Sequence, residues 1–219
     1  MAYDVLAESV ALIESRQLVR VQRLSRRRRF AAMSVDVDTE TGLAVTAFAR
    51  RGVGCIWRDR HVLALRQGRW VLLGGGGSNG DADDLLADRP PVLAPGPGVT
   101  HQLRPGSGAA AHLILSGVGG GVHDSGGRAD RWPWSGRWVN YTELQASSLV
   151  SSLAVSGRVL PVPWHGLVVI VWTGPHRPRV VAQDRDGRRV EEVVLTAGSN
   201  RKPIRYRDGR PLGVGQHER

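Results

Sequence analysis

The stretch HVLALRQGRWVLL, residues 61–73, decides how the first half of the chain is expected to fold. Two strand-like runs flank Gln67-Gly68, and two strands joined by two such residues predict a β-hairpin. A hairpin with this turn has the cross-strand pairs Leu65–Trp70 and Leu63–Leu72. The stretch therefore predicts neighbouring antiparallel strands at 61–66 and 69–73.

Three more strand-like runs precede the hairpin, at 30–37, 43–50 and 53–57. The turn signals DTETG, ARRG and RDR separate the runs, which predicts an antiparallel meander. Residues 3–17 place Leu6, Val10 and Ile13 at helical spacing, so this segment is predicted to be an amphipathic helix. Such a helix is expected to cover one face of the meander.

This order of elements, a helix followed by a curved meander, resembles the cystatin-like and NTF2-like folds. The resemblance covers residues 3–73 and includes no family motif. It implies that the first half can enclose a small-molecule pocket between the helix and the sheet. It assigns no catalytic residue.

The glycine run GGGGSNG, residues 74–80, precedes the acidic segment DADDLLAD, residues 81–88. A phosphate-binding loop requires GK[ST] after its glycines or a spaced G-x-G-x-x-G that opens a helix, and neither is present. Asp81, Asp83 and Asp84 would repel phosphate, and their spacing does not match an EF-hand calcium loop. We therefore interpret the run as a flexible connector.

Composition then divides the chain into two halves. The Pro/Gly-rich RPPVLAPGPG, residues 89–98, is the predicted linker, and the short strand-like runs beyond it favour a β-sandwich-like all-β half at 99–197. The predicted fold class is α+β and β-rich, with a helix packed on an antiparallel meander in residues 1–88. Residues 198–219 are predicted to form a basic, weakly ordered tail.

The bulk composition is typical of a soluble globular protein, with 41% hydrophobic residues and no apolar run near the ~20 residues of a membrane span. Asp4 and Glu8 lie where a signal peptide would be basic, so we expect a cytoplasmic protein without a membrane partner. Cys55 is the only cysteine, which excludes an intramolecular disulfide and a Cys-rich zinc site. No cofactor is predicted, and the oligomeric state stays open.

The net charge is +10, and Lys202 is the only lysine among 30 basic residues. A GC-rich genome also favours arginine, so the clustering of the charge at 23–29 and 201–210 says more than its total. The candidate basic patch consists of Arg26, Arg27, Arg28 and Arg29. Such a cluster predicts a polyanionic partner, nucleic acid included. A solvated turn between the helix and the sheet is the alternative.

The chain has seven Trp against two Phe, and three of the Trp residues lie in DRWPWSGRWVNY, residues 130–141. Trp is enriched in binding hot spots, so this Trp/Arg loop is a candidate contact surface. Its candidate residues are Arg131, Trp132, Trp134, Arg137 and Trp138, and Trp164 and His165 of PVPWHG form a second contribution. The alternative is that these indoles fold back onto a sheet as core residues.

Residues 99–117, VTHQLRPGSGAAAHLILSG, suggest a pair of histidines. If PGSG forms a four-residue hairpin loop, His101 and His112 lie directly opposite each other on an otherwise apolar face. They could then bind a metal, with His123 or Asp124 as a third ligand. A loop one residue longer or shorter separates them, and buried neutral histidines bonded to the backbone are the other alternative.

No serine-hydrolase, zinc-protease or kinase motif is present, so no catalytic residue is assigned. The leading functional prediction is a non-catalytic binding protein that engages a protein or other acidic partner through the Trp/Arg loop and the basic segments. One alternative is a small-molecule or metal-dependent enzyme centred on His101, His112 and His123. The third is a nucleic-acid-binding protein, whose affinity would fall steeply with salt.

Overall fold

The computed structural model describes residues 3–78, 85–93, 113–126, 136–174, 177–195, 206–207 and 210–211. In these residues the protein consists of one short helix and a β-rich body of antiparallel sheets, which confirms the predicted N-terminal helix and β-rich class. No helix of the described part combines the length and the hydropathy needed to cross a membrane.

The first sheet is the predicted meander, with its strands side by side in chain order. The strands are β1 (Phe30–Asp38), β2 (Leu43–Arg51), β3 (Ile56–Arg66) and β4 (Arg69–Ser78). Gln67 and Gly68 both adopt positive φ in the β3–β4 turn. The predicted pairs Leu65–Trp70 and Leu63–Leu72 are both present, so the hairpin prediction is confirmed in its register.

Two predicted breaks in this sheet are wrong. Arg58, Asp59 and Arg60 do not form a turn, because β3 runs through them and they pair with β2 on one side and with β4 on the other. The glycine run is not a flexible connector, because residues 74–77 belong to β4 and pair with β3. Both segments read as loops in the sequence because aspartate and glycine are depleted in strands.

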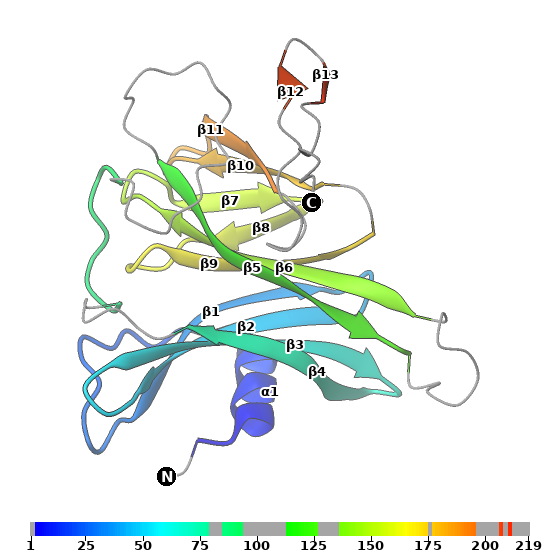
Figure 1. Ribbon diagram of the computed structural model, residues 1–219. Coiled ribbons are helices and arrows are strands. Elements are labelled where there is room, and N and C mark those ends of the chain that lie inside the picture. The colour runs from blue at the N-terminus through cyan, green and yellow to red at the C-terminus, as the bar shows by residue number, and fades with distance from the viewer. Residues whose placement is uncertain are drawn as a thin grey trace, which may run out of the picture.

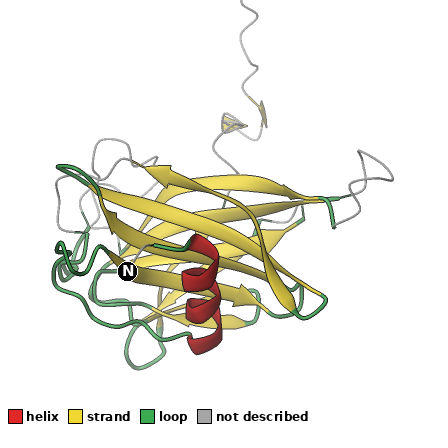
Figure 2. Cartoon of the chain, turned by 90° about the horizontal axis from the view of Figure 1, so that it is seen from below, coloured by secondary structure: helices red, strands yellow, loops and turns green. Residues whose placement is uncertain are grey.

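The helix α1 (Val5–Ser15) covers the outer face of the first sheet (Figures 1 and 2). It begins at Asp4, whose carboxylate caps the first turn, and it ends at Arg16 in the left-handed conformation. Ile13 is buried against Ala44 and Leu63 of the sheet. The predicted amphipathic helix is therefore present and packs on the meander as expected.

The second half adds two more antiparallel sheets. The middle sheet contains β5 (Ile114–Asp124), β6 (Arg137–Ala146) and β9 (Leu167–Thr173). The third sheet contains β7 (Ser152–Val155), β8 (Arg158–Pro161), β10 (Arg179–Gln183) and β11 (Arg189–Val194), in the order β11-β10-β7-β8. A small ladder joins β12 (Tyr206–Arg207) to β13 (Arg210–Pro211) within the predicted tail.

The middle sheet lies between the other two and is buried on both faces (Figure 1). One face of β9 contributes Val169 to a core shared with the first sheet, and its other face contributes Ile170 to a core shared with the third. This double burial explains the continuous apolar run LVVIVWT, residues 167–173. The first core thus contains residues of both predicted halves, while the predicted domain boundaries stay a prediction.

Glycines of β4 and β5 make room for one buried tyrosine. Tyr141 of β6 points toward the place where these two strands run beside each other without pairing. A Cβ atom at Gly76 of β4 would lie 2.7 Å from the Tyr141 hydroxyl, and one at Gly120 of β5 would lie 2.6 Å from it. Close approach across the sheets, not flexibility, therefore explains glycine at these two positions.

Strands β1 and β9 meet along a second line, here called the β1–β9 seam. A bulge in β1 turns the side chains of both Met33 and Ser34 inward. Within the seam, the backbone N–H of Val169 donates to Ser34 Oγ at 3.0 Å, and the N–H of Val171 donates to Asp36 Oδ2 at 2.9 Å. Ser34 and Asp36 of the first sheet thereby accept hydrogen bonds from the N–H groups at the free edge of the middle sheet.

Asp36 is also the point where all three sheets meet. Arg158 of β8 forms ion pairs with Asp36 and Asp38, each at 3.1 Å, and donates to the Val171 carbonyl at 2.9 Å. Burial raises the pKa of Asp36 to about 6, against the opposing effects of Arg158 and the Val171 N–H. The ionised carboxylate is therefore costly in this position even with its partners.

The first prediction concerns the packing of Tyr141. Gly76→Ala should lower the free energy of unfolding by about 1–3 kcal/mol, because the added methyl overlaps the tyrosine hydroxyl. Tyr141→Phe should remove most of this penalty, since the next ring atom is 4.0 Å from that methyl. It should not remove the penalty of Gly120→Ala, whose methyl would lie 2.7 Å from the ring carbon itself. Urea unfolding of the single and double variants measures this, and equal rescue at both glycines would contradict the packing.

The second prediction concerns pH. The folded protein binds a proton at Asp36 more tightly than the unfolded chain, so this group's contribution to stability should fall as the pH rises from about 4 to about 6. A pKa raised from 3.8 to about 6 corresponds to about 3 kcal/mol over that window. In Asp36→Asn this decline should disappear. Urea unfolding of both proteins across pH 4 to 7 measures the difference, and parallel stability curves would refute it.

Candidate functional site

The candidate site is built on the turn that precedes β1. The Ser25 N–H donates to the Arg28 carbonyl at 2.9 Å, and the Arg28 N–H donates to Ser25 Oγ at 3.1 Å. These two bonds close the turn and place Arg26 and Arg27 at its tip. The turn is anchored by Leu24, which is buried in the first core. The predicted basic segment is therefore an ordered turn that presents its arginines.

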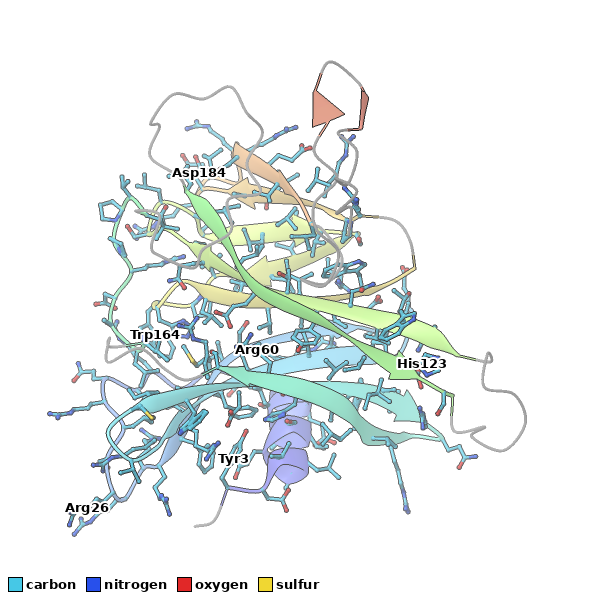
Figure 3. The ribbon with its side chains drawn as sticks, in the orientation of Figure 1. Tyr3, Arg26, Arg60, His123, Trp164 and Asp184 are labelled. Atoms are coloured by element: carbon cyan, nitrogen blue, oxygen red, sulfur yellow. The ribbon has the colours of Figure 1, made fainter. Side chains whose placement is uncertain are left out.

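A neighbouring loop adds one further arginine to this surface. The Arg51 N–H at the end of β2 donates to the Arg29 carbonyl at 2.7 Å. We define the basic patch as Arg23, Arg26, Arg27, Arg28, Arg29 and Arg51, all exposed. None of the six forms an ion pair with a described residue. Arg26 projects away from the sheets (Figure 3).

Two adjoining clefts run beside the basic patch. The first has a volume of about 380 Å³ and lies between α1, the patch and the start of β1. Its lining is Glu8, Gln17, Val19, Val21, Arg27, Arg28, Arg29, Phe30, Ala31 and Ala32. The second, of about 460 Å³, shares Val21 and Arg28 with the first. The first cleft therefore combines two valines and two alanines with guanidinium groups, and Glu8 is the only acid among the described residues that line either cleft.

One carboxylate of the chain already pairs at the rim of these clefts. Arg20, which lines the second cleft, donates from Nη2 to both carboxylate oxygens of Asp88, at 2.6 and 2.8 Å. Both side chains are more than half exposed, so the pair adds little to stability. It illustrates the chemistry that the other arginines offer to a carboxylate.

The aromatic residues near the patch are engaged with one another. Tyr3 packs against Phe30 and Phe48, and its hydroxyl lies 2.9 Å from His61 Nε2. Burial lowers the pKa of His61, so its imidazole is neutral at pH 7. Arg50 lies over the Tyr3 ring and pairs with a carboxylate of β3. This cluster joins the start of α1 to the sheet, and its Phe30 also lines the first cleft.

The structure describes two residues of the predicted Trp/Arg loop, Arg137 and Trp138, at the start of β6. Arg131, Trp132 and Trp134 lie outside the described residues. The Arg137 guanidinium is already used within the protein, because it pairs with Asp124 at 3.2 Å and donates to a backbone carbonyl of the β1–β2 turn. Trp138 is 63% exposed, so its position is compatible with the predicted contact role.

Trp164 and His165, the second predicted contribution to the contact surface, are less accessible than Trp138. The Trp164 indole N–H donates to the Leu86 carbonyl at 3.0 Å. His165 is 3% exposed, and its Nδ1 accepts from the Leu167 N–H at 3.1 Å. Burial lowers the pKa of His165 to about 4, so it is neutral. In this conformation His165 is not available to a partner at the surface.

The predicted metal ligands are not brought together in the described part of the chain. His101 and His112 lie outside the described residues, so their pairing stays a prediction. His123 is exposed, and its ring packs edge-on against Trp138 with the ring centroids 5.7 Å apart. Asp124 is buried and is used by Arg66, by a second arginine and by a backbone N–H. No group of three or more His, Cys, Asp or Glu side chains forms a metal site among the described residues.

Comparison with models of protein families, with curated proteins and with solved structures finds no match for this chain. The case for a function therefore rests on geometry. Sequence reasoning found residues 26–29 but missed Arg51 and the clefts. Val21 and Leu24, the apolar residues beside the arginines, were the available signal, because both are buried in the first core and anchor the segment there.

The third prediction concerns Asp124, which ties β5 to the first sheet. Burial opposes its ionisation, but hydrogen bonds from Gly126, Arg66 and Arg137 outweigh it and lower the pKa. Asp124→Asn should therefore lower the free energy of unfolding by about 2 kcal/mol, less than for a fully enclosed pair because both guanidinium groups are partly exposed.

The matched control for this prediction is Asp186→Asn. Asp186 pairs with Arg188 on the surface, where both side chains are mostly exposed. Its replacement should change the free energy of unfolding by less than about 0.5 kcal/mol. Chemical denaturation at pH 7 compares the two variants. Losses of similar size would mean that Asp124 is not a structural tie.

Proposed function

We propose that the protein is a non-catalytic binding protein that engages an acidic, extended segment of another protein through the basic patch and its clefts. The observation that carries the proposal is a group of six exposed arginines, five on an ordered turn and one at the end of β2, none paired with a described acid, beside clefts that also contain aliphatic side chains. A surface of this kind complements alternating carboxylate and apolar side chains.

Charge supports the choice of an acidic ligand. Guanidinium groups form strong charge-assisted hydrogen bonds with carboxylates, and Arg20 already donates from Nη2 to both oxygens of Asp88. The unpaired arginines concentrate positive potential at one end of a chain whose net charge is +10. Such a field speeds the encounter with an acidic partner and favours it over a basic one.

The residues around the patch favour a protein segment over nucleic acid. Val19 is 64% exposed and Val53 is fully exposed, so apolar side chains of a peptide have contacts to make. Proteins that bind single-stranded nucleic acid usually offer open aromatic faces for base stacking. Tyr3 and Phe30 next to the patch are packed together instead, and the half-buried Trp57 lies against Arg50. Nucleic-acid binding is the second candidate, and the charge alone supports it.

Trp138 is proposed as a separate contact surface. It is 63% exposed, and its neighbour His123 lies at the other end of the molecule from Arg26 in Figure 3. One short segment would therefore not reach both places. The Trp/Arg loop and the basic patch are best tested as independent sites.

The fourth prediction tests the basic patch. The variant Arg26→Gln, Arg27→Gln, Arg28→Gln and Arg29→Gln should bind a fluorescent Glu- and Leu-rich dodecapeptide at least about tenfold more weakly than the wild type, because several charge-assisted contacts are lost. Fluorescence anisotropy at several salt concentrations measures the affinity. Wild-type affinity should fall with salt, and the variant should show a shallower dependence.

A matched control removes the same number of charges elsewhere. Arg185, Arg188 and Arg189 are exposed residues in or beside the β10–β11 turn, and Arg177 is an exposed residue before β10. Asp184, at the start of that turn, lies far from Arg26 in Figure 3. Joint replacement of the four arginines by Gln should leave the peptide affinity within about twofold, because long-range effects are screened at physiological salt. If both variants lose peptide affinity equally, net charge alone explains the binding and the basic patch is not a specific site. Binding of an oligothymidylate but not of the peptide would replace the proposal with nucleic-acid binding.

A further inference from the structure

The margin of the first sheet at β4 is apolar and exposed. Strand β4 is the last strand of this sheet and pairs only with β3 among the described strands (Figure 1). Three large side chains at this margin are exposed, Leu65 by 47%, Leu72 by 41% and Val71 by 37%. Residues 70–78, WVLLGGGGS, include no charged residue. We call Trp70, Val71 and Leu72 the open edge.

The other outer strands have features that hinder pairing of a sheet edge with another chain. Strands β1 and β9 cover each other at the β1–β9 seam. Strand β8 has four residues and ends at Pro161, and β11 carries Glu191 and Glu192. Strand β5 is interrupted by a bulge between Ser116 and Gly119. The open edge has none of these features, because its pairs with β3 are continuous and its side chains are uncharged.

The backbone of the open edge has groups available for pairing. In a hairpin with a two-residue turn, the residues that close the turn exchange backbone hydrogen bonds, and so does every second residue beyond them. Arg69 and Val71 therefore direct their N–H and C=O groups toward β3. The N–H and C=O groups of Trp70 and Leu72 point outward, and no described residue bonds to them. Another strand can accept and donate at these groups.

We propose that the open edge pairs with the open edge of a second copy of this chain, antiparallel and about a two-fold axis at Val71. In this register Trp70 lies opposite Leu72 of the second copy, and the two residues exchange their outward hydrogen bonds. Trp70 and Leu72 share the face of the sheet that carries Leu65. Each aromatic–aliphatic pair across the two copies therefore extends that exposed apolar surface, which stabilises the pairing.

Charge favours a second copy as the occupant. The uncharged open edge complements another uncharged edge, and residues 70–78 offer no cation to the acidic segment proposed for the basic patch. Arg69 does not oppose Arg69 in this register, because it lies opposite Leu73 of the second copy. The interface is therefore independent of the basic patch.

Size and net charge make this dimer weak. The contact uses a few residues of each copy, whereas a standard interface uses roughly 20–30 residues a side. Two chains of net charge +10 also repel each other. Salt screens this repulsion, so the dimer should become stronger with salt, whereas peptide binding at the basic patch should become weaker.

The fifth prediction uses disulfide trapping in the variant Cys55→Ser, which has no other thiol. Val71→Cys should form a disulfide-linked dimer under mild oxidation, because directly opposed residues of this type have Cα atoms about 4.5 Å apart. Arg69→Cys should form one at least about tenfold more slowly, since the two copies of residue 69 would lie roughly 13 Å apart along the strands. Val159→Cys, at an exposed valine of β8, measures random collision and should be equally slow.

Sedimentation equilibrium of the wild type tests the same interface without a covalent bond. The monomer–dimer equilibrium should shift toward dimer between about 0.05 and 0.5 M salt. Leu72→Lys should weaken dimerisation at least about tenfold, because it places a charge in the paired edge. Val159→Lys is the matched control and should dimerise as the wild type does. Circular dichroism and the thermal midpoint confirm that both variants are folded.

Three results would show that the open edge does not join two copies. The first is a wild type that stays monomeric up to about 1 mM. The second is a Val71→Cys variant that crosslinks no faster than Arg69→Cys and Val159→Cys. The third is a Leu72→Lys variant that dimerises as strongly as the wild type, which would place the dimer contact elsewhere.

Discussion

The buried contact between β1 and the free edge of β9 is the constraint on which the rest of the structure depends. Strand β9 is buried on both faces, so its outer N–H groups cannot turn to water. Ser34 and Asp36 accept from those groups, and Arg158 brings the third sheet to the same carboxylate. Asp36 thereby contacts residues of the other two sheets, and the described strands of the first sheet and of the middle sheet do not pair with each other.

Local features of this fold could be predicted from the sequence, and contacts across sheets could not. The Gln67-Gly68 hairpin depends on residues that are neighbours in the chain, so its register was predictable. Gly76 of β4 is required by Tyr141, which lies far along the chain, and so the glycine run reads as a connector in the sequence. Ser34 and Asp36 look like outward-facing positions of a strand, because only the bulge at Met33 turns them inward.

The same difference between local and distant contacts applies to the candidate sites. Residues 26–29 are contiguous, so their cluster of charge was visible before the structure was known. The clefts beside them are formed by the packing of α1 against the start of β1, which no short motif encodes. Arg58 and Arg60 resembled a solvated turn because the partner that makes them interior, Glu143, comes from another sheet. Buried charge of this kind is recognised only when its partner is known.

Amide hydrogen exchange along β9 tests the central claim most directly. The outward N–H groups of Val169 and Val171 bond to side chains of β1, whereas alternate amides of the strand face β6. If the β1–β9 seam unites the sheets, the amides of Val169 and Val171 should exchange as slowly as those of Val168 and Ile170, and only by global unfolding. Fast exchange at Val169 and Val171, with slow exchange at their neighbours, would show an open edge and contradict the account.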